Sequence, residues 1–219
     1  MALPPLPQRV SDVPQLLDHI LLGSSDLQHG IDFVEQHIGV RAAFGGVHPG
    51  RGTQNALLAL GERRYLEIIA PDPDQHVPQR QDSFKSLVEP RLIGWAAHPG
   101  NLDEFAAKLR ASGVAFDGPQ PGSRRRPDGR LLNWRTLNLK DDHGGLLPFF
   151  IEWSADTVHP SVDAPKGCAL LRFSVATPEQ EDLLHAAKLV QLDLQVPMSD
   201  KPALQATIAG PKGELVLPT

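Results

Sequence analysis

The stretch Leu17-Asp18-His19-Ile20-Leu21-Leu22 has the composition of a buried strand that carries one metal-capable imidazole. A second stretch, Tyr65-Leu66-Glu67-Ile68-Ile69, has the same character with one carboxylate. Alternate side chains of a strand share a face, so His19 and Glu67 each point where apolar neighbours point. A buried carboxylate is costly unless a cation or hydrogen bonds compensate it. The pattern therefore indicates a site; the alternative is a hydrogen-bonded core histidine and a glutamate on a hydrated sheet face.

The overall composition is that of an ordinary globular protein. The chain has 219 residues, 41% of them hydrophobic, and a formal net charge of -5, which predicts neither nucleic acid nor an anionic membrane as a partner. No apolar run approaches the ~20 residues that span a bilayer, and residues 1–9 lack the apolar stretch of a signal peptide. Cys168 is the only cysteine, so we expect no intrachain disulfide and a cytoplasmic location.

One pattern occurs three times along the chain: an apolar strand, a turn, an amphipathic helix, and then strands separated by Gly and Pro. The repeats predict βαβββ units over residues 14–72 and 90–155, and a reduced βαβββ-like unit over residues 166–219. Residues 71–78 are rich in proline and predict a loop between the first two units. This order of elements predicts an α+β fold with mixed sheets.

Four short segments carry a family resemblance. They are Leu-Asp-His at 17–19, His-Pro-Gly-Arg-Gly-Thr-Gln-Asn at 48–55, Tyr-Leu-Glu at 65–67 and Leu-Pro-Phe-Phe-Ile-Glu-Trp at 147–153. Together they resemble the glyoxalase-like branch of the vicinal-oxygen-chelate superfamily, which includes glyoxalase I, extradiol dioxygenases and bleomycin-resistance proteins. The second segment is the most specific. The resemblance implies that repeated βαβββ units curve their mixed sheets around a cleft.

The resemblance also implies a divalent metal ion held by the first and last strands of each unit. By position, its ligands are His19, Glu67 and Glu152. The fourth position falls on Gly94 or Trp95, neither of which binds a metal through its side chain. One nitrogen and two carboxylates are close to the ligand set that suits a divalent first-row metal with open positions.

Further residues are candidates for catalysis and for substrate binding. His48 is the candidate base because an imidazole titrates near neutral pH; its alternative role is to brace the turn that follows it. Glu152 is assigned a catalytic as well as a metal-binding role. Asn55 and Trp134 are candidate substrate-binding residues, through an amide and a flat aromatic surface. Arg135 is a candidate for binding an anion, with Glu152 as its alternative partner.

The basic run Arg124-Arg125-Arg126 lies between two segments that contain Gly and Pro. This placement predicts a flexible loop with a solvated charge run, and attraction of an anionic ligand is the alternative.

Two functions are consistent with these features, and the fold does not choose between them. The first is a metal-dependent isomerase, lyase or dioxygenase that acts on a small oxygenated substrate. The second is a metal-free protein that binds a small molecule in the same cleft, which the missing ligand at 94–95 favours. The third unit buries its sheet either against the first two units or against a second copy, which would give a homodimer.

Overall fold

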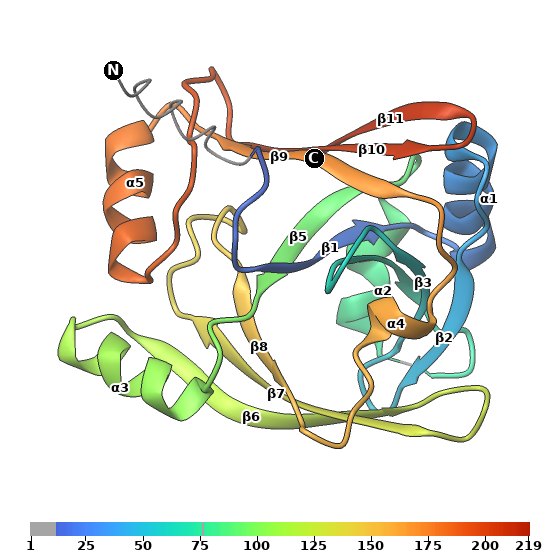
Figure 1. Ribbon diagram of the computed structural model, residues 1–219, viewed down its shortest axis with the longest axis horizontal. Helices are drawn as coiled ribbons and strands as arrows, with labels where there is room; N and C mark the ends of the chain where they lie inside the picture. Colours follow the sequence, from blue (N-terminus) through green and yellow to red (C-terminus); the bar gives the residue numbers. More distant parts are fainter. Residues whose placement is uncertain (1–11, 76) are drawn as a thin grey trace, which may run out of the picture.

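The computed structural model describes residues 12–75 and 77–219, so the N-terminal segment considered above lies outside the described residues. Figure 1 shows a strongly curled sheet of eight strands and a separate sheet of three strands, with few helices. This architecture confirms the predicted α+β fold with curved mixed sheets. The helices and strands are, in chain order, β1 (Leu17–Gly23), α1 (Leu27–Ile38), β2 (Ala43–His48), β3 (Thr53–Ala59), β4 (Tyr65–Pro71), α2 (Pro78–Lys85), β5 (Arg91–Ala97), α3 (Leu102–Ala111), β6 (Phe116–Arg125), β7 (Leu131–Leu139), β8 (Phe149–Trp153), α4 (Pro160–Asp163), β9 (Ala169–Ala176), α5 (Gln180–Leu189), β10 (Ala203–Gly210) and β11 (Gly213–Pro218).

The eight-stranded sheet is built from two half-sheets of four strands. Its order is β2-β3-β4-β1-β5-β8-β7-β6, so each predicted βαβββ unit contributes one half. Strand β1 pairs parallel with β4 and antiparallel with β5, while β5 pairs parallel with β8. The halves therefore join along β1 and β5, where His19 lies opposite Ala96. The curl also brings the outermost strands, β2 and β6, into contact.

Helix α1 shows how the local sequence sets the ends of an element. The side chain of Asp26 accepts a hydrogen bond from the backbone N–H of His29 at 2.9 Å and so caps the first turn. Gly39 ends the helix with a φ of 81°, a left-handed conformation that glycine adopts readily. Ile31 and Val34 are buried, and the helix covers β3 and β4 and contacts β10 and β11.

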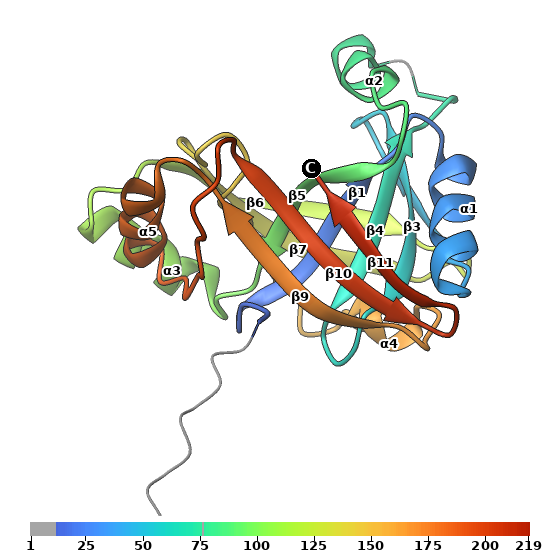
Figure 2. The ribbon, with the colours of Figure 1, turned by 90° about the horizontal axis from the view of Figure 1, so that it is seen from above.

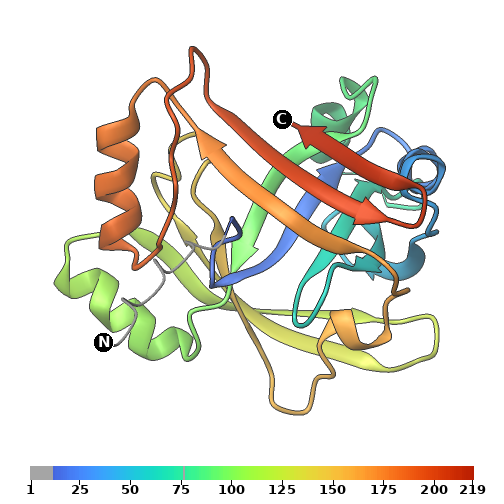
Figure 3. The same cartoon turned by 45° about the horizontal axis from the view of Figure 1, so that its top comes forward.

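The third unit packs against the first two. It contains β9, α5, β10 and β11, and its antiparallel sheet lies across β5 and α1 (Figures 2 and 3). Phe173, Val175 and Ile208 are buried in the same hydrophobic core as Ile20 and Trp95. The rings of Trp95 and Phe173 lie 5.1 Å apart. The chain therefore buries one face of this sheet itself, and the homodimer stays a prediction.

Two segments differ from the sequence analysis. Strand β6 runs from Phe116 to Arg125 and so includes the first two arginines of the basic run. The expectation that Arg124 and Arg125 lie in a flexible loop is therefore wrong. β6 is the edge strand of its half-sheet, which is where Pro119 is tolerated because an edge strand leaves backbone groups unpaired.

Helix α2 follows the expected loop in the connection between the first two units, where no helix was predicted. It begins at Pro78, and proline is favourable in the first turn because its missing N–H would have no partner in the helix. Within the described part of the chain, every helix is too short or too polar to cross a membrane.

Candidate functional site

A cavity of about 370 Å³ lies inside the curled sheet. The two half-sheets line it with different chemistry. Strands of the first half contribute His19, His48, Asn55 and Glu67. The second half contributes apolar and aromatic side chains, three neutral polar side chains and one cation from β6; the polar ones are Gln120, Thr136 and Asn138. The second-half side chains that matter below are Arg124, Trp134, Phe149, Ile151 and Trp153.

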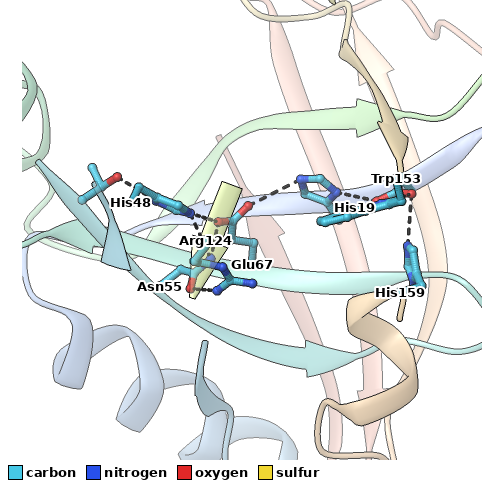
Figure 4. Close-up of polar contacts among 9 residues, drawn as sticks. His19, His48, Asn55, Glu67, Arg124, Trp153 and His159 are labelled. Atoms are coloured by element: carbon cyan, nitrogen blue, oxygen red, sulfur yellow. Dashed lines mark hydrogen bonds and ion pairs between the residues drawn. The ribbon is translucent and has the colours of Figure 1, made fainter. Parts of the chain in front are cut away.

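The carboxylate of Glu67 lies between two imidazoles (Figure 4). Its Oε2 atom is 3.4 Å from His19 Nε2, and its Oε1 atom is 3.6 Å from His48 Nε2. Burial opposes ionisation of Glu67, which is 8% exposed. The charge that His48 and His19 carry when protonated, a hydrogen bond from Asn55 and the charge of Arg124 together outweigh burial and lower the pKa of Glu67. Glu67 is thus a buried ionised carboxylate that faces a cavity.

His48 directs its Nε2 atom toward both Asn55 and Glu67. Its Nδ1 atom lies 2.9 Å from the hydroxyl of Thr53, and its Nε2 atom lies 3.4 Å from the amide nitrogen of Asn55 and 3.6 Å from Glu67 Oε1. An amide NH₂ group can only donate, so the contact with Asn55 needs an unprotonated Nε2, whereas the contact with Glu67 needs a proton on it. His48 thus has a polar partner for Nε2 in either protonation state, which is what a group that exchanges protons needs.

Asn55 links Glu67 to the buried cation. Its amide nitrogen donates to Glu67 Oε1 at 2.6 Å, and its Oδ1 atom accepts a hydrogen bond from Arg124 Nη1. Burial lowers the pKa of Arg124, and the charge of Glu67 opposes this effect. Gly45 makes the contact possible, because a Cβ atom at this position would overlap both Arg124 Nη1 and Asn55 Oδ1.

A second network holds His19 from behind. The Nδ1 atom of His19 lies 2.7 Å from Asp18 Oδ1, so it donates to the carboxylate and leaves Nε2 directed at Glu67. Asp18 Oδ2 accepts from His159 Nε2 and from the indole N–H of Trp153, each at 3.2 Å. Burial opposes ionisation of Asp18, but the hydrogen bonds from His159 and His19 outweigh it and hold the pKa of Asp18 well below its usual range.

Aromatic rings fix the plane of the His19 imidazole. The ring of Tyr65 stacks on it with centroids 4.4 Å apart, and Phe149 meets it edge-on at 5.6 Å. Desolvation in the same place raises the pKa of Tyr65 well above its usual value, so its phenol stays protonated. His19 is therefore fixed by one carboxylate and two rings.

A family model of the glyoxalase-like domain matches residues 17–190, which is most of the chain. The chain belongs to the glyoxalase-like domain family. This membership confirms the resemblance to the vicinal-oxygen-chelate superfamily. No curated protein matches the sequence of this glyoxalase-like protein.

Several solved structures have a similar fold. A hypothetical protein from Staphylococcus aureus superposes with a TM-score of 0.65 at 16% identity, covering 92% of this chain and 84% of that one. Methylmalonyl-CoA epimerase from Mycobacterium tuberculosis gives a TM-score of 0.46 at 21% identity, covering 67% of this chain and 92% of the epimerase. The Streptomyces coelicolor epimerase, in complex with 2-nitronate-propionyl-CoA, gives 0.47 at 22% identity, covering 67% and 99%. At such identities the shared feature is the fold.

The structure of the glyoxalase-like domain brings together most of the residues that the sequence singled out. His19, His48, Asn55 and Glu67 converge on the cavity from four strands of the first half-sheet, and Trp134 lines the opposite wall. Their roles in catalysis and binding remain predictions.

Glu152 and Arg135 lie outside the cavity, which corrects their placement in the predicted site. Alternation along β8 points Ile151 and Trp153 into the cavity and Glu152 to the other face of the sheet. There Glu152 pairs with Arg135, which also binds Asp103 on α3 at 2.9 Å. The alternative partner considered for Arg135 is the observed one.

Sequence reasoning missed two residues of the site, Asp18 and His159, and it considered Arg124 at the site only as the alternative to a solvated loop. Asp18 adjoins His19 and could have been considered as its hydrogen-bond partner. Arg124 was assigned to a loop, and the only signal for its position is the pair Gly45-Gly46, which lets β6 approach β2. His159 carries no signal of its own, because only the folded chain brings it to Asp18.

Members of this superfamily typically use a divalent metal ion, which needs several donor side chains directed at one point. On β8 the side chains that face the cavity are Phe149, Ile151 and Trp153, and the expected ligand Glu152 lies on the other face. His19 and His48 approach Glu67 from two sides, each facing a different carboxylate oxygen (Figure 4). Among the described residues, no three His, Cys, Asp or Glu side chains are arranged to hold a metal. These residues do not match the metal site that the resemblance implies.

Proposed function

We propose that this glyoxalase-like protein is an enzyme that moves a proton on a small oxygenated molecule, as an isomerase or a lyase. One observation carries the proposal: the buried ionised carboxylate of Glu67 lies between the imidazoles of His19 and His48 and faces the cavity. Titratable groups that share one cavity and perturb one another's protonation are typical of acid–base sites. Proton transfer is also chemistry that these side chains can perform by themselves.

In this proposal His48 is the general base. His48 lines the cavity, and in its unprotonated form the Nε2 atom would accept a proton from a carbon next to a carbonyl or carboxyl group. Glu67 stays ionised and stabilises the imidazolium that forms on His48. His19 lies on the other side of Glu67, and Asp18 holds it with Nε2 toward the cavity, so His19 is the second proton carrier.

The second candidate function is a metal-free binding protein. The aromatic wall of the cavity supports it, because Trp134 and Trp153 both line the cavity, with ring centroids 5.5 Å apart. Such a wall binds a flat apolar ligand without any chemistry.

Exchange of carbon-bound hydrogen with solvent distinguishes the two functions. We would incubate the protein in D₂O with a panel of 2-hydroxyaldehydes, 2-oxo acids and 3-oxo acids and follow deuterium incorporation by NMR. We expect catalysed exchange in at least one compound and a loss of about a hundredfold or more in His48→Gln, the usual contribution of a general base.

Glu62→Gln is the matched control, because Glu62 is exposed and lies outside the cavity. Compounds that bind in the cavity but show no catalysed exchange would overturn the enzymatic proposal and leave the binding function.

A further inference from the structure

Arg124 is a buried cation with spare hydrogen-bonding capacity. Only 3% of its surface is exposed, and it lines the cavity. Several other arginines of the described chain form ion pairs with carboxylates, such as Arg126 with Asp163 and Arg135 with Glu152. Arg124 forms no ion pair within 4.0 Å among the residues that the structure describes, and its hydrogen bond there goes to the neutral amide of Asn55.

The protein itself satisfies only part of this guanidinium. A guanidinium has five N–H donors in a planar fork, and the bond to Asn55 uses a single nitrogen. Burying a cation is costly, and the charge of Glu67, which Asn55 links to Arg124, offsets part of that cost. Because the rest of the fork borders the cavity, an anion held there would satisfy it in the bidentate geometry that arginine forms with carboxylates.

The backbone is shaped to keep Arg124 in this position. Gly45 leaves room for the guanidinium beside Asn55, as described above. At Gly46 the φ angle is 135°, and a Cβ atom there would lie 2.6 Å from the carbonyl oxygen of Arg125. The two glycines therefore let β6 lie close against β2, which directs the side chain of Arg124 inward.

The charges of the cavity indicate a monoanion. The permanently cationic groups that line it are Arg124 and the exposed Arg51, and the lining carboxylate is Glu67. With the imidazoles of His19 and His48 neutral, two positive charges against one negative charge leave a single positive charge for the ligand to neutralise. A dianion such as a phosphate ester would add a second negative charge near Glu67.

We infer that Arg124 binds the carboxylate of a small monocarboxylic acid whose apolar body lies along Trp134 and Ile151. This inference rests on the proposed function, because it assigns the substrate class of the same cavity. The carboxylate at Arg124 would fix the ligand, and the rest of the molecule would then lie between the imidazoles and the aromatic wall. The substrate of the proton-transfer reaction would thus be a carboxylic acid.

Binding of benzoate tests the inference without knowledge of the substrate. We would titrate the full-length protein with benzoate, its neutral analogue benzamide and inorganic phosphate, using calorimetry and the fluorescence of the cavity tryptophans. We expect benzoate to bind at least about tenfold more tightly than benzamide, as a charge-assisted bidentate contact predicts. Phosphate should bind more weakly than benzoate.

Substitutions at Arg124 and Arg125 test whether Arg124 is the side chain that binds benzoate. Arg124→Gln should lose at least about tenfold in benzoate affinity, and Arg124→Lys should keep an intermediate affinity because lysine retains the charge without the fork. Arg125→Gln is the matched control: Arg125 is the next residue on β6, is exposed, and bonds to the carbonyl of Gly129. Its affinity should not change. If Arg124→Gln does not fold, the comparison of benzoate with benzamide on the parent protein still tests whether the cavity prefers a carboxylate.

The two proposals fail in different ways. Equal affinity for benzoate and benzamide, no binding of either, or an Arg124→Gln protein with unchanged benzoate affinity would overturn the role of Arg124. Arg124-dependent benzoate binding without deuterium exchange in any carboxylic acid would support the carboxylate site and overturn the enzymatic proposal.

Discussion

The Nε2 atom of His159 lies 3.2 Å from Oδ2 of Asp18, although 141 positions separate the two residues. His159 caps the N-terminus of α4, in the connection that follows the second unit. Its Nδ1 atom accepts from the backbone N–H of Ser161 at 3.3 Å, so Nε2 carries the proton and donates to Asp18. A connection far along the chain thus holds the carboxylate that orients His19.

Replacement of this carboxylate should make the protein less stable at neutral pH. In Asp18→Asn the two imidazoles and the indole lose a buried ionised acceptor, and the loss of one partner of a buried pair costs on the order of 3 kcal/mol. We expect that decrease in the free energy of unfolding at pH 7, measured in urea. Asp156→Asn, at an exposed position, should change it by less than about 0.5 kcal/mol.

The difference in the free energy of unfolding between the parent and Asp18→Asn should depend on pH. The pKa of Asp18 in the folded state lies well below 3.8, its usual value. Stability from this group is therefore fully present above that usual value and is lost as the pH falls toward the folded-state pKa. The difference between parent and Asp18→Asn should shrink as the pH is lowered from 5 to 2. A constant difference over this range would contradict the lowered pKa.

Addition of one methyl group to β2 should disturb the cavity. In Gly45→Ala the new Cβ atom overlaps Arg124 and Asn55, so the guanidinium has to move. We expect benzoate affinity to fall by about tenfold or more, while the circular dichroism spectrum stays that of the parent. Ala43→Ser, at an exposed position of the same strand, is the control. Unchanged affinity in Gly45→Ala would show that Arg124 does not bind the ligand.

Removal of Glu152 should leave the chemistry of the cavity unchanged. Glu152 pairs with Arg135 at the other face of the sheet, where solvent screens the pair. Glu152→Gln should therefore lower the free energy of unfolding by at most about 1 kcal/mol and leave benzoate binding and deuterium exchange at parental rates. A loss of exchange comparable with that of His48→Gln would restore Glu152 to the site.

Elemental analysis should find substoichiometric metal in the purified protein, even after incubation with manganese, iron, nickel or zinc. The reason is the set of donor side chains: His19 and His48 face different oxygens of Glu67, and among the described residues that line the cavity the second half contributes no His, Cys, Asp or Glu. The parent would be analysed beside His19→Ala. One equivalent of metal in the parent, lost in His19→Ala and removed by a chelator together with activity, would contradict this expectation.

The sequence predicted the fold well because the fold depends on repeated local patterns. Apolar strands, the capped helix that ends at Gly39, and the turn residues occur in the same order in the first two units. Strand β6 was missed because its prolines and glycines are typical of loops, and only its position at the edge of a sheet makes them acceptable.

The sequence predicted those site residues whose direction follows from the pattern of their own strand. His19 and Glu67 follow from alternation along their own strands, so both lie on the cavity. Alternation along β8 places Glu152 on the face away from the cavity, and the sequence alone does not show which face of β8 is concave. Arg124 and His159 reach the site across 69 and 141 residues of chain, to Asn55 and Asp18, and no local pattern contains such contacts.

The unequal walls of the cavity have a stereochemical consequence. Two half-sheets of equivalent topology would give a symmetrical cavity if their side chains matched, and a ligand could then bind in two orientations. Here the imidazoles belong to one half and the rings of Trp134 and Trp153 to the other. A planar prochiral molecule held in this cavity would expose a single face to His48, so a product formed there would have one handedness.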